Sequence, residues 1–180
     1  TPIEFFKADY GPTPRAGLPV MTFRDTITFH LNGDEATALH VPNAHTDGDT
    51  IIRFRSANVV HMGDTYFNGL YPFIDTGTNG SVKGVIAAVD RVLALTDDTS
   101  KIIPGHGPLS NKAELKAYRE MLIKLNANVD ALVKAKKTLA QVIAAKPTRD
   151  FDAKWGNGFL KPDQFVEIVY NSAVAGQKKK

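Results

Sequence analysis

The stretch Val59-Val60-His61-Met62-Gly63-Asp64 decides the fold that we expect for this chain. It is typical of a short apolar strand that ends in a glycine-containing loop, and Lys101-Ile102-Ile103-Pro104-Gly105-His106 repeats this form. Between the two, Ser81 can cap a helix whose apolar residues recur at three- and four-residue spacings. These apolar residues are Val82, Val85, Ile86, Val89, Val92 and Leu93. The succession of strand, helix and strand predicts an α/β layered domain.

More strands are expected upstream. Thr26 to Leu31 alternates with period two, Asn32-Gly33-Asp34 supplies turn residues, and Ala36 to Val41 is expected to be the return strand of this hairpin. Thr50 to Arg55 and Asn58 to Met62 predict a second pair. The sheet should therefore be mostly antiparallel or mixed and flanked by helices.

Helices dominate the second half of the sequence. A long amphipathic helix is expected from Asn111 to about Lys137, and Asn111 and Glu114 are spaced like a capping box. Thr138-Leu139-Ala140-Gln141 repeats this signal for a shorter helix that Pro147 ends. A last helix is expected from Asp163 to Val174.

The chain has the length of one domain, with 180 residues of which 43% are hydrophobic and 23% charged, as in soluble globular proteins. We expect an extended lead-in over residues 1–19, one domain over residues 20–175 and a basic tail over residues 176–180. No apolar run approaches the ~20 residues that a membrane-spanning helix needs, so no membrane contact is expected.

The composition also bears on partners and location. The last three lysines, Lys178 to Lys180, account for the whole net charge of +3, so a solvated tail is expected and no nucleic-acid partner. There is no cysteine, which excludes disulfides and thiolate metal ligands. The start Thr1-Pro2-Ile3-Glu4 reads as processed or truncated. The sequence does not fix the localisation, and we favour a periplasmic or secreted location over the cytoplasm.

Three polar residues directly follow candidate strands: His45, Asp64 and His106. Two imidazoles and a carboxylate suit Zn²⁺, Fe²⁺ or Mn²⁺. Glycines on both sides of His106 permit close backbone approach around it.

The other histidines lie in candidate strands. For His30 and His40 a half-buried, hydrogen-bonded structural role is expected, and His61 is expected to be structural or to support a metal ligand.

Other candidates are weaker. Tyr66 and Asn68 follow Asp64 closely and are candidates to line the site, and Asp49 is a candidate to support it. Asp47-Gly48-Asp49 is expected to be a polar turn, because Asn58 stands where a calcium-binding EF-hand loop needs a carboxylate. Aromatic residues expected to serve packing are Phe67, Tyr71, Phe73 and Trp155.

In order, the motifs His45-Thr46-x-Gly48-Asp49, Met62-Gly63-Asp64-Thr65 and Pro104-Gly105-His106-Gly107 resemble those of the metallo-β-lactamase-fold hydrolases. The segment from Tyr66 to Asp75 is similar to one broad branch of that superfamily, and the resemblance covers residues 18–125. It implies half of a four-layer αββα sandwich, namely the C-terminal half.

The resemblance implies that His45 binds a first metal ion, His106 a second, and that Asp64 bridges the two. Two Zn²⁺ per complete site are implied, with iron or manganese as alternatives. The family's upstream His-x-His-x-Asp-His motif is absent from this sequence, so no catalytic residue beyond the metal ligands is assigned. The chain is expected to work with its missing N-terminal half or a second chain, as a retained fragment, a homo-oligomer or a swapped dimer.

The implied activity is hydrolysis of a small molecule by metal-activated water, on an ester, thioester, lactone, amide or phosphoester. Phe67 stands where one group of lactamases has a substrate-binding lysine, and residues 66–70 depart from the glyoxalase continuation. Two alternatives stay open. One is a mononuclear site made by the two histidines and the aspartate. The other is an inactive fragment that acts as a scaffold or interaction half.

Overall fold

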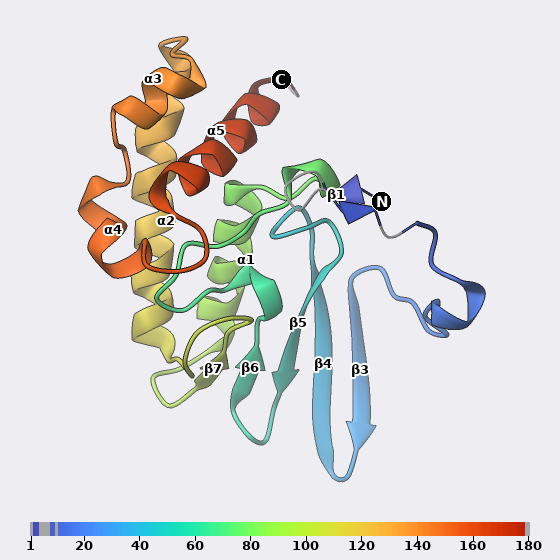
Figure 1. The fold of residues 1–180 in the computed structure, drawn as a ribbon. Coiled ribbons are helices and arrows are strands. Elements are labelled where there is room, and N and C mark those ends of the chain that lie inside the picture. The colour runs from blue at the N-terminus through green and yellow to red at the C-terminus, as the bar shows by residue number, and fades with distance from the viewer. Residues whose placement is uncertain (1, 4–7, 10, 179–180) are drawn as a thin grey trace.

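A five-stranded mixed sheet forms the centre of the structure (Figure 1), a computed structural model that describes residues 2–3, 8–9 and 11–178. The strands are β3 (Thr26–Leu31), β4 (Asp34–Val41), β5 (Asp49–Phe54), β6 (Val59–His61) and β7 (Lys101–Ile103), and they lie in this order across the sheet. Strands β3 to β6 pair antiparallel, and β6 pairs parallel with β7. The predicted α/β class and mixed sheet are confirmed.

The parallel pair follows from the helix between its strands. Helix α1 (Val82–Leu95) begins at Ser81, whose hydroxyl accepts a hydrogen bond from the Gly84 amide at 3.0 Å. Its apolar face is buried, as the spacing predicts. A crossover helix of this kind lets β7 return beside β6 in the same direction.

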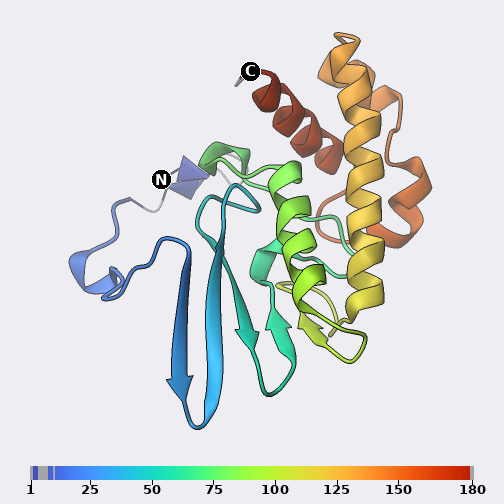
Figure 2. The ribbon, with the colours of Figure 1, turned by 180° about the vertical axis from the view of Figure 1, so that it is seen from behind.

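The remaining helices form a layer outside α1. They are α2 (Lys112–Lys134), α3 (Leu139–Ala144), α4 (Arg149–Trp155) and α5 (Pro162–Lys178). Figure 2 shows α1 beside the sheet and α2 beyond it, with α2 in contact with both α1 and α5. The helices therefore cover one side of the sheet. The buried core is formed by side chains of the sheet and of these helices.

Several details differ from the expectation. The capping box of α2 is half formed, because Asn111 accepts from the Glu114 amide whereas the Glu114 carboxylate accepts from the Ser110 hydroxyl at 2.9 Å. The box at Thr138 is complete. Helix α2 ends at Lys134 rather than near residue 137, α4 was not predicted, and α5 extends through residues 176–178 of the expected tail.

From residue 11 to the start of the sheet the chain is exposed. Of the expected lead-in, the structure describes the short strands β1 (Pro2–Ile3) and β2 (Ala8–Asp9), which pair antiparallel, and the 3₁₀ turn η2 (Arg15–Gly17). Residues 1, 4–7 and 10 of the lead-in, and residues 179–180 of the tail, lie outside the described residues. No helix in the described ranges is long and apolar enough to cross a membrane.

Candidate metal centre

Three loops meet at one end of the sheet. Strands β4 and β6 both run antiparallel to β5, and β7 runs parallel to β6, so β4, β6 and β7 all end on the same side. The loops that follow them carry His45, Asp64 and His106 respectively. Residues far apart in the sequence are thus brought together by the sheet topology.

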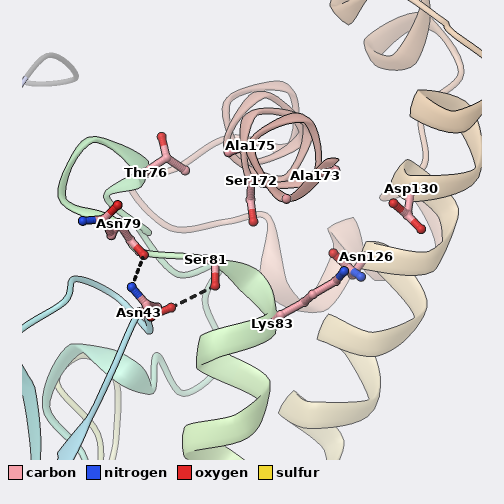
Figure 3. A pocket seen from close by; sticks show the side chains of 12 residues that line it. Asn43, Thr76, Asn79, Ser81, Lys83, Asn126, Asp130, Ser172, Ala173 and Ala175 are labelled. Atoms are coloured by element: carbon pink, nitrogen blue, oxygen red, sulfur yellow. Dashed lines mark hydrogen bonds between the residues drawn. The ribbon is translucent and has the colours of Figure 1, made fainter. Parts of the chain in front are cut away.

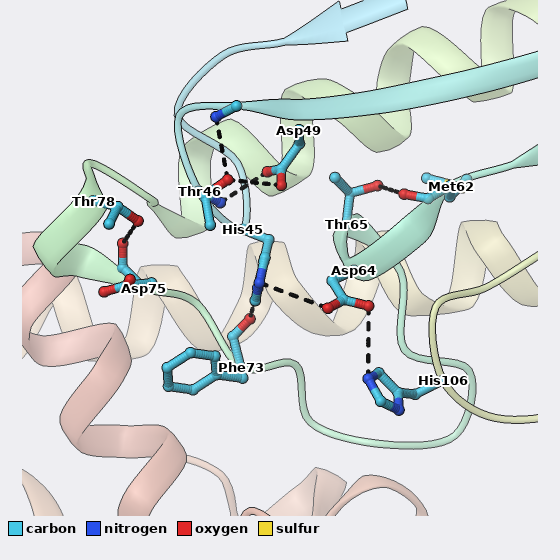
Figure 4. Close-up of polar contacts among 11 residues, drawn as sticks. His45, Thr46, Asp49, Met62, Asp64, Thr65, Phe73, Asp75, Thr78 and His106 are labelled. Atoms are coloured by element: carbon cyan, nitrogen blue, oxygen red, sulfur yellow. Dashed lines mark hydrogen bonds and ion pairs between the residues drawn. The ribbon is translucent and has the colours of Figure 1, made fainter. Parts of the chain in front are cut away.

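The three side chains face one another (Figure 4). The Nε2 atom of His45 lies 3.7 Å from Oδ2 of Asp64, and the Nε2 atom of His106 lies 3.6 Å from Oδ1 of the same carboxylate. The His45 side chain is 16% exposed, that of Asp64 43% and that of His106 52%. Each imidazole therefore faces a different oxygen of the Asp64 carboxylate, which is accessible to solvent.

Backbone contacts hold both the ring and the main chain of His45. Its Nδ1 atom lies 2.7 Å from the carbonyl oxygen of Phe73, and its own carbonyl accepts from the Asp75 amide at 2.8 Å. A carbonyl oxygen only accepts hydrogen bonds, so Nδ1 must carry a proton, and in the neutral ring the lone pair is then on Nε2, the nitrogen that faces Asp64. The carboxylate of Asp49 fixes the next residue by accepting from the amide and hydroxyl of Thr46 at 2.8 and 2.9 Å.

The Asp64 and His106 loops are joined by main-chain bonds. The Gly105 amide donates to the carbonyls of Gly63 at 2.8 Å and Tyr66 at 3.0 Å, and the Asn68 amide donates to the His106 carbonyl at 2.9 Å. A Cβ on Gly105 would lie 2.2 Å from Oδ1 of Asp64, which no real Cβ tolerates. Glycine at position 105 therefore permits the close approach of the two loops.

The residues expected to support the site lie around these loops. Nδ1 of His61 accepts from the Gly63 amide at 3.1 Å, and the Asn68 side chain donates to the Pro108 carbonyl at 3.2 Å. Tyr66 instead points into the core, where its hydroxyl meets that of Ser110 at 2.7 Å and burial raises its pKa to about 12. His61 and Asn68 thus contact the loops that carry Asp64 and His106, whereas Tyr66 contacts the protein interior.

His30 in β3 and His40 in β4 do not line the cavity over the site. His40 contacts the Asp47 carbonyl through Nε2 at 2.8 Å, as expected of a structural residue. His30 is 73% exposed and only 3.9 Å from the Glu35 carboxylate, so the expectation of a half-buried imidazole is wrong there. The physical reason is that β3 is the outermost strand of the sheet and its side chains are largely exposed.

A cavity of about 430 Å³ opens over the three side chains. Its lining residues are His45, Thr46, Asp64, Phe67, Phe73, Asp75, His106 and Phe159. Phe67 and Phe73 are buried, as packing residues should be, but they also form the cavity wall. No local signal in the sequence points to Phe159, because it lies 95 positions beyond Asp64 and reaches the site only through the tertiary fold.

A second cavity, of about 250 Å³, lies between the start of α1 and α5 (Figure 3). Several of its polar groups have partners: the Ser172 hydroxyl accepts from the Val82 amide at 3.1 Å, and the Ser81 hydroxyl donates to the Asn43 carbonyl at 2.9 Å. The Asn43 side chain in turn donates to the Asn79 carbonyl at 3.2 Å. This region therefore supports the loop that carries His45.

The donor set fits metal ions that share one carboxylate. Two ligand atoms of one tetrahedral zinc ion lie roughly 3.4 Å apart, close to the 3.6 and 3.7 Å that separate each Nε2 from its Asp64 oxygen. Within the described part of the chain, no group of three or more histidine or acidic side chains is placed to hold a metal ion. The described residues thus offer two pairs of donor atoms, each with one imidazole nitrogen and one oxygen of Asp64, and no complete set of ligands.

The sequence matches no protein-family model and no curated protein sequence. Solved structures do match. A metallo-β-lactamase from Pontibacter korlensis is 19% identical with a TM-score of 0.52, over 59% of this chain and 49% of that one. A metallo-β-lactamase family protein from Thermus thermophilus is 16% identical with a TM-score of 0.57, over 90% of this chain and 50% of that one.

A third similar structure is the stereoselective inverting sec-alkylsulfatase from Pseudomonas sp., at 16% identity and a TM-score of 0.65. The match covers 84% of this chain and 26% of that protein. The chain therefore spans a half or less of the length of each of these proteins. These likenesses confirm the expected fold: the chain has part of a metallo-β-lactamase fold.

Proposed function

We propose that this chain supplies part of a dinuclear metal centre in a hydrolase with the metallo-β-lactamase fold. The observation that carries the proposal is the placement of two imidazole Nε2 atoms against the two separate oxygens of Asp64. His45 would hold one ion, His106 the other, and Asp64 would be a ligand of both. Zinc suits these ligands best, and iron or manganese can take the same donors.

Metal ions held here would lower the pKa of a bound water toward ~7 and so supply hydroxide at neutral pH. The chain's own residues hold the ligands in place for this chemistry. The Phe73 carbonyl keeps the His45 ring in one tautomer, and the main-chain bonds around Gly105 keep Asp64 beside His106. The bond cleaved is an ester, thioester, lactone, amide or phosphoester.

The proposal includes a partner, because one histidine and a shared carboxylate leave each ion short of ligands. The partner is an N-terminal half of the fold or a second copy of this chain. The exposed large apolar residues of the first sheet strand and the segment before it support this: Leu18, Val20, Met21, Phe23, Phe29 and Leu31. Native mass spectrometry should find the 19.6 kDa chain with a second polypeptide or as an oligomer, and a stable lone monomer would contradict this part.

Metal binding tests the centre directly. Zinc bound after equilibrium dialysis should fall in His106→Ala through loss of one ion and in Asp64→Ala through loss of both. His30→Ala is the matched control, because this exposed histidine lies beside the Asn32-Gly33 turn at the opposite end of the sheet. An unchanged zinc content in His106→Ala would refute the assignment.

The same measurement separates the two alternatives. A mononuclear site requires one tightly bound ion per chain, which both His45→Ala and His106→Ala abolish. The described residues form no group of three metal ligands, and each imidazole faces a different oxygen of Asp64. This argues against a mononuclear site and favours either a shared dinuclear site or an inactive scaffold. A scaffold predicts no bound metal in the assembled protein and unfolding that chelator does not change.

A further inference from the structure

The wall of the cavity over the candidate centre is unusually aromatic for a site with so many polar ligands. Phe67, Phe73 and Phe159 make up three of its eight lining residues. Its volume of about 430 Å³ is that of a small-molecule site, in which apolar surface binds the ligand and a few polar groups orient it.

The phenylalanines are arranged around the two imidazoles. The Phe67 ring stacks on His106 with 4.6 Å between centroids, and Phe159 lies beyond it, 6.4 Å from Phe67. On the other side Phe73 meets His45 edge to face at 5.7 Å. A ligand that reaches Asp64 therefore lies between two imidazoles, each of which packs against a phenylalanine ring.

Phe159 is the exposed member of this wall. Its side chain is 52% exposed, whereas Phe67 and Phe73 are 1% and 8% exposed. The loop that carries it is anchored, because the Tyr71 amide donates to the Trp155 carbonyl at 3.0 Å and Gly158 lies against Leu70. A single exposed phenylalanine is ordinary, but this one is held at the rim of a cavity and has apolar surface left to bury.

The charges of the lining also restrict the ligand. The ionisable groups of the cavity are His45, His106 and the carboxylates of Asp64 and Asp75, and no lysine or arginine is among the described lining residues. The nearest lysine on the Phe159 loop, Lys161, donates to the Gly158 carbonyl at 3.0 Å. The protein surface of this cavity thus offers an anionic group no fixed positive partner.

We propose that the substrate carries a neutral, apolar group, aryl or branched alkyl, beside the bond that is cleaved, and that Phe159 is a specificity-determining residue that binds it. This inference rests on the proposed function. A phosphate or carboxylate at that position is disfavoured, because a buried charge without a partner loses its hydration. Phe67 and Phe73 form the fixed wall, and Phe159 closes over the apolar group.

The test uses the full chain in the presence of a chelator, so that no metal charge enters. Amide shifts in ¹H–¹⁵N NMR are followed during titration with N-benzylacetamide, which is neutral, and with phenylacetate, which carries the same ring and an anion. We expect the amide to bind about five-fold or more tightly than phenylacetate. Phe159→Ala should weaken amide binding about five-fold, and Phe159→Leu should recover most of this.

Phe54→Ala is the matched control, because Phe54 is 39% exposed and ends β5 at the other end of the sheet. The inference is overturned if phenylacetate binds as tightly as the amide, if no amide binding is seen up to its solubility limit, or if Phe159→Ala behaves like Phe54→Ala. Zinc content of Phe159→Ala should match the unmodified chain. If the zinc content of His106→Ala is unchanged, the proposed metal centre is refuted. The NMR result on ligand binding at Phe159 does not depend on that outcome.

Discussion

The Nδ1 atom of His45 lies 2.7 Å from the carbonyl oxygen of Phe73, so the backbone fixes which ring nitrogen of this histidine carries its proton. In the neutral ring the lone pair is then on Nε2, which faces Asp64 and can bind a cation.

The first prediction concerns this tautomer. Long-range ¹H–¹⁵N NMR at about pH 8 should find neutral His45 protonated at Nδ1, because the carbonyl can only accept. His30, which is exposed and has no carbonyl partner at this distance, serves as the control in the same spectrum. Protonation of His45 at Nε2 would show that the Phe73 contact does not set the ring state.

The second prediction concerns Gly105. Gly105→Ala places a methyl group 2.2 Å from Oδ1 of Asp64 and must push the carboxylate or the loop aside. We expect zinc affinity to fall about ten-fold or more, as when support of a metal ligand is lost. Gly48→Ala is the control, since a Cβ at Gly48 meets nothing within 4 Å. Equal zinc affinity of the two variants would contradict the prediction.

The third prediction concerns the contact between α1 and the His45 loop. A Cβ on Gly84 would lie 1.7 Å from the Asn43 carbonyl oxygen, so Gly84→Ala should lower the free energy of unfolding by about 2–3 kcal/mol. Gly176→Ala in α5 has open space and should be neutral or stabilising by up to ~1 kcal/mol. Denaturant unfolding of both variants makes the comparison, and a stable Gly84→Ala would mean that the loop can move away.

The fourth prediction is a pH dependence. Hydrogen bonds from the Thr99 hydroxyl and amide, and then from Asn58, lower the pKa of Asp97 to about 2. A lowered carboxyl pKa stabilises the folded chain above the unfolded pKa near 4 and loses this effect as pH falls toward 2. Asp97→Asn should therefore be less stable than the unmodified chain at pH 7, with a difference that shrinks below about pH 4.

Denaturant unfolding at several pH values measures this difference. Asp98→Asn, on the same exposed turn, is the control and should show little difference at any pH. A difference between Asp97→Asn and the unmodified chain that stays constant down to about pH 2.5 would contradict the assigned cause.

Most of the sheet could be predicted from the sequence, because local signals decide it. Thr26 to Leu31 alternates, and the turn that follows has Asn32 and Gly33 at φ of 55° and 76°, as their residue types indicate. The cap of α1 at Ser81 is equally local. Helix α4 escaped prediction because seven residues are too few to show a helical period, and it is stabilised through the buried Trp155.

The candidate site was predictable only in part. Placement after strands singled out His45, Asp64 and His106, and the resemblance gave them roles, which stay predictions. Their approach to within 4 Å depends on strand order, which no local signal contains. Glu114 shows the same limit. Its spacing from Asn111 predicts a capping box, in which its carboxylate accepts from the Asn111 amide, but the carboxylate accepts from the Ser110 hydroxyl in the preceding loop instead.

The main-chain bonds that link the loops after β6 and β7 have a consequence for the thermodynamics of ion uptake. Because the Gly105 and Asn68 amides already bond across the two loops, Asp64 and His106 are preorganised by folding itself. Little main-chain entropy therefore remains to be lost when a cation arrives at this pair. The affinity of Asp64 and His106 for a metal ion should therefore depend mainly on the further ligands that a partner supplies, and little on any rearrangement of these two loops.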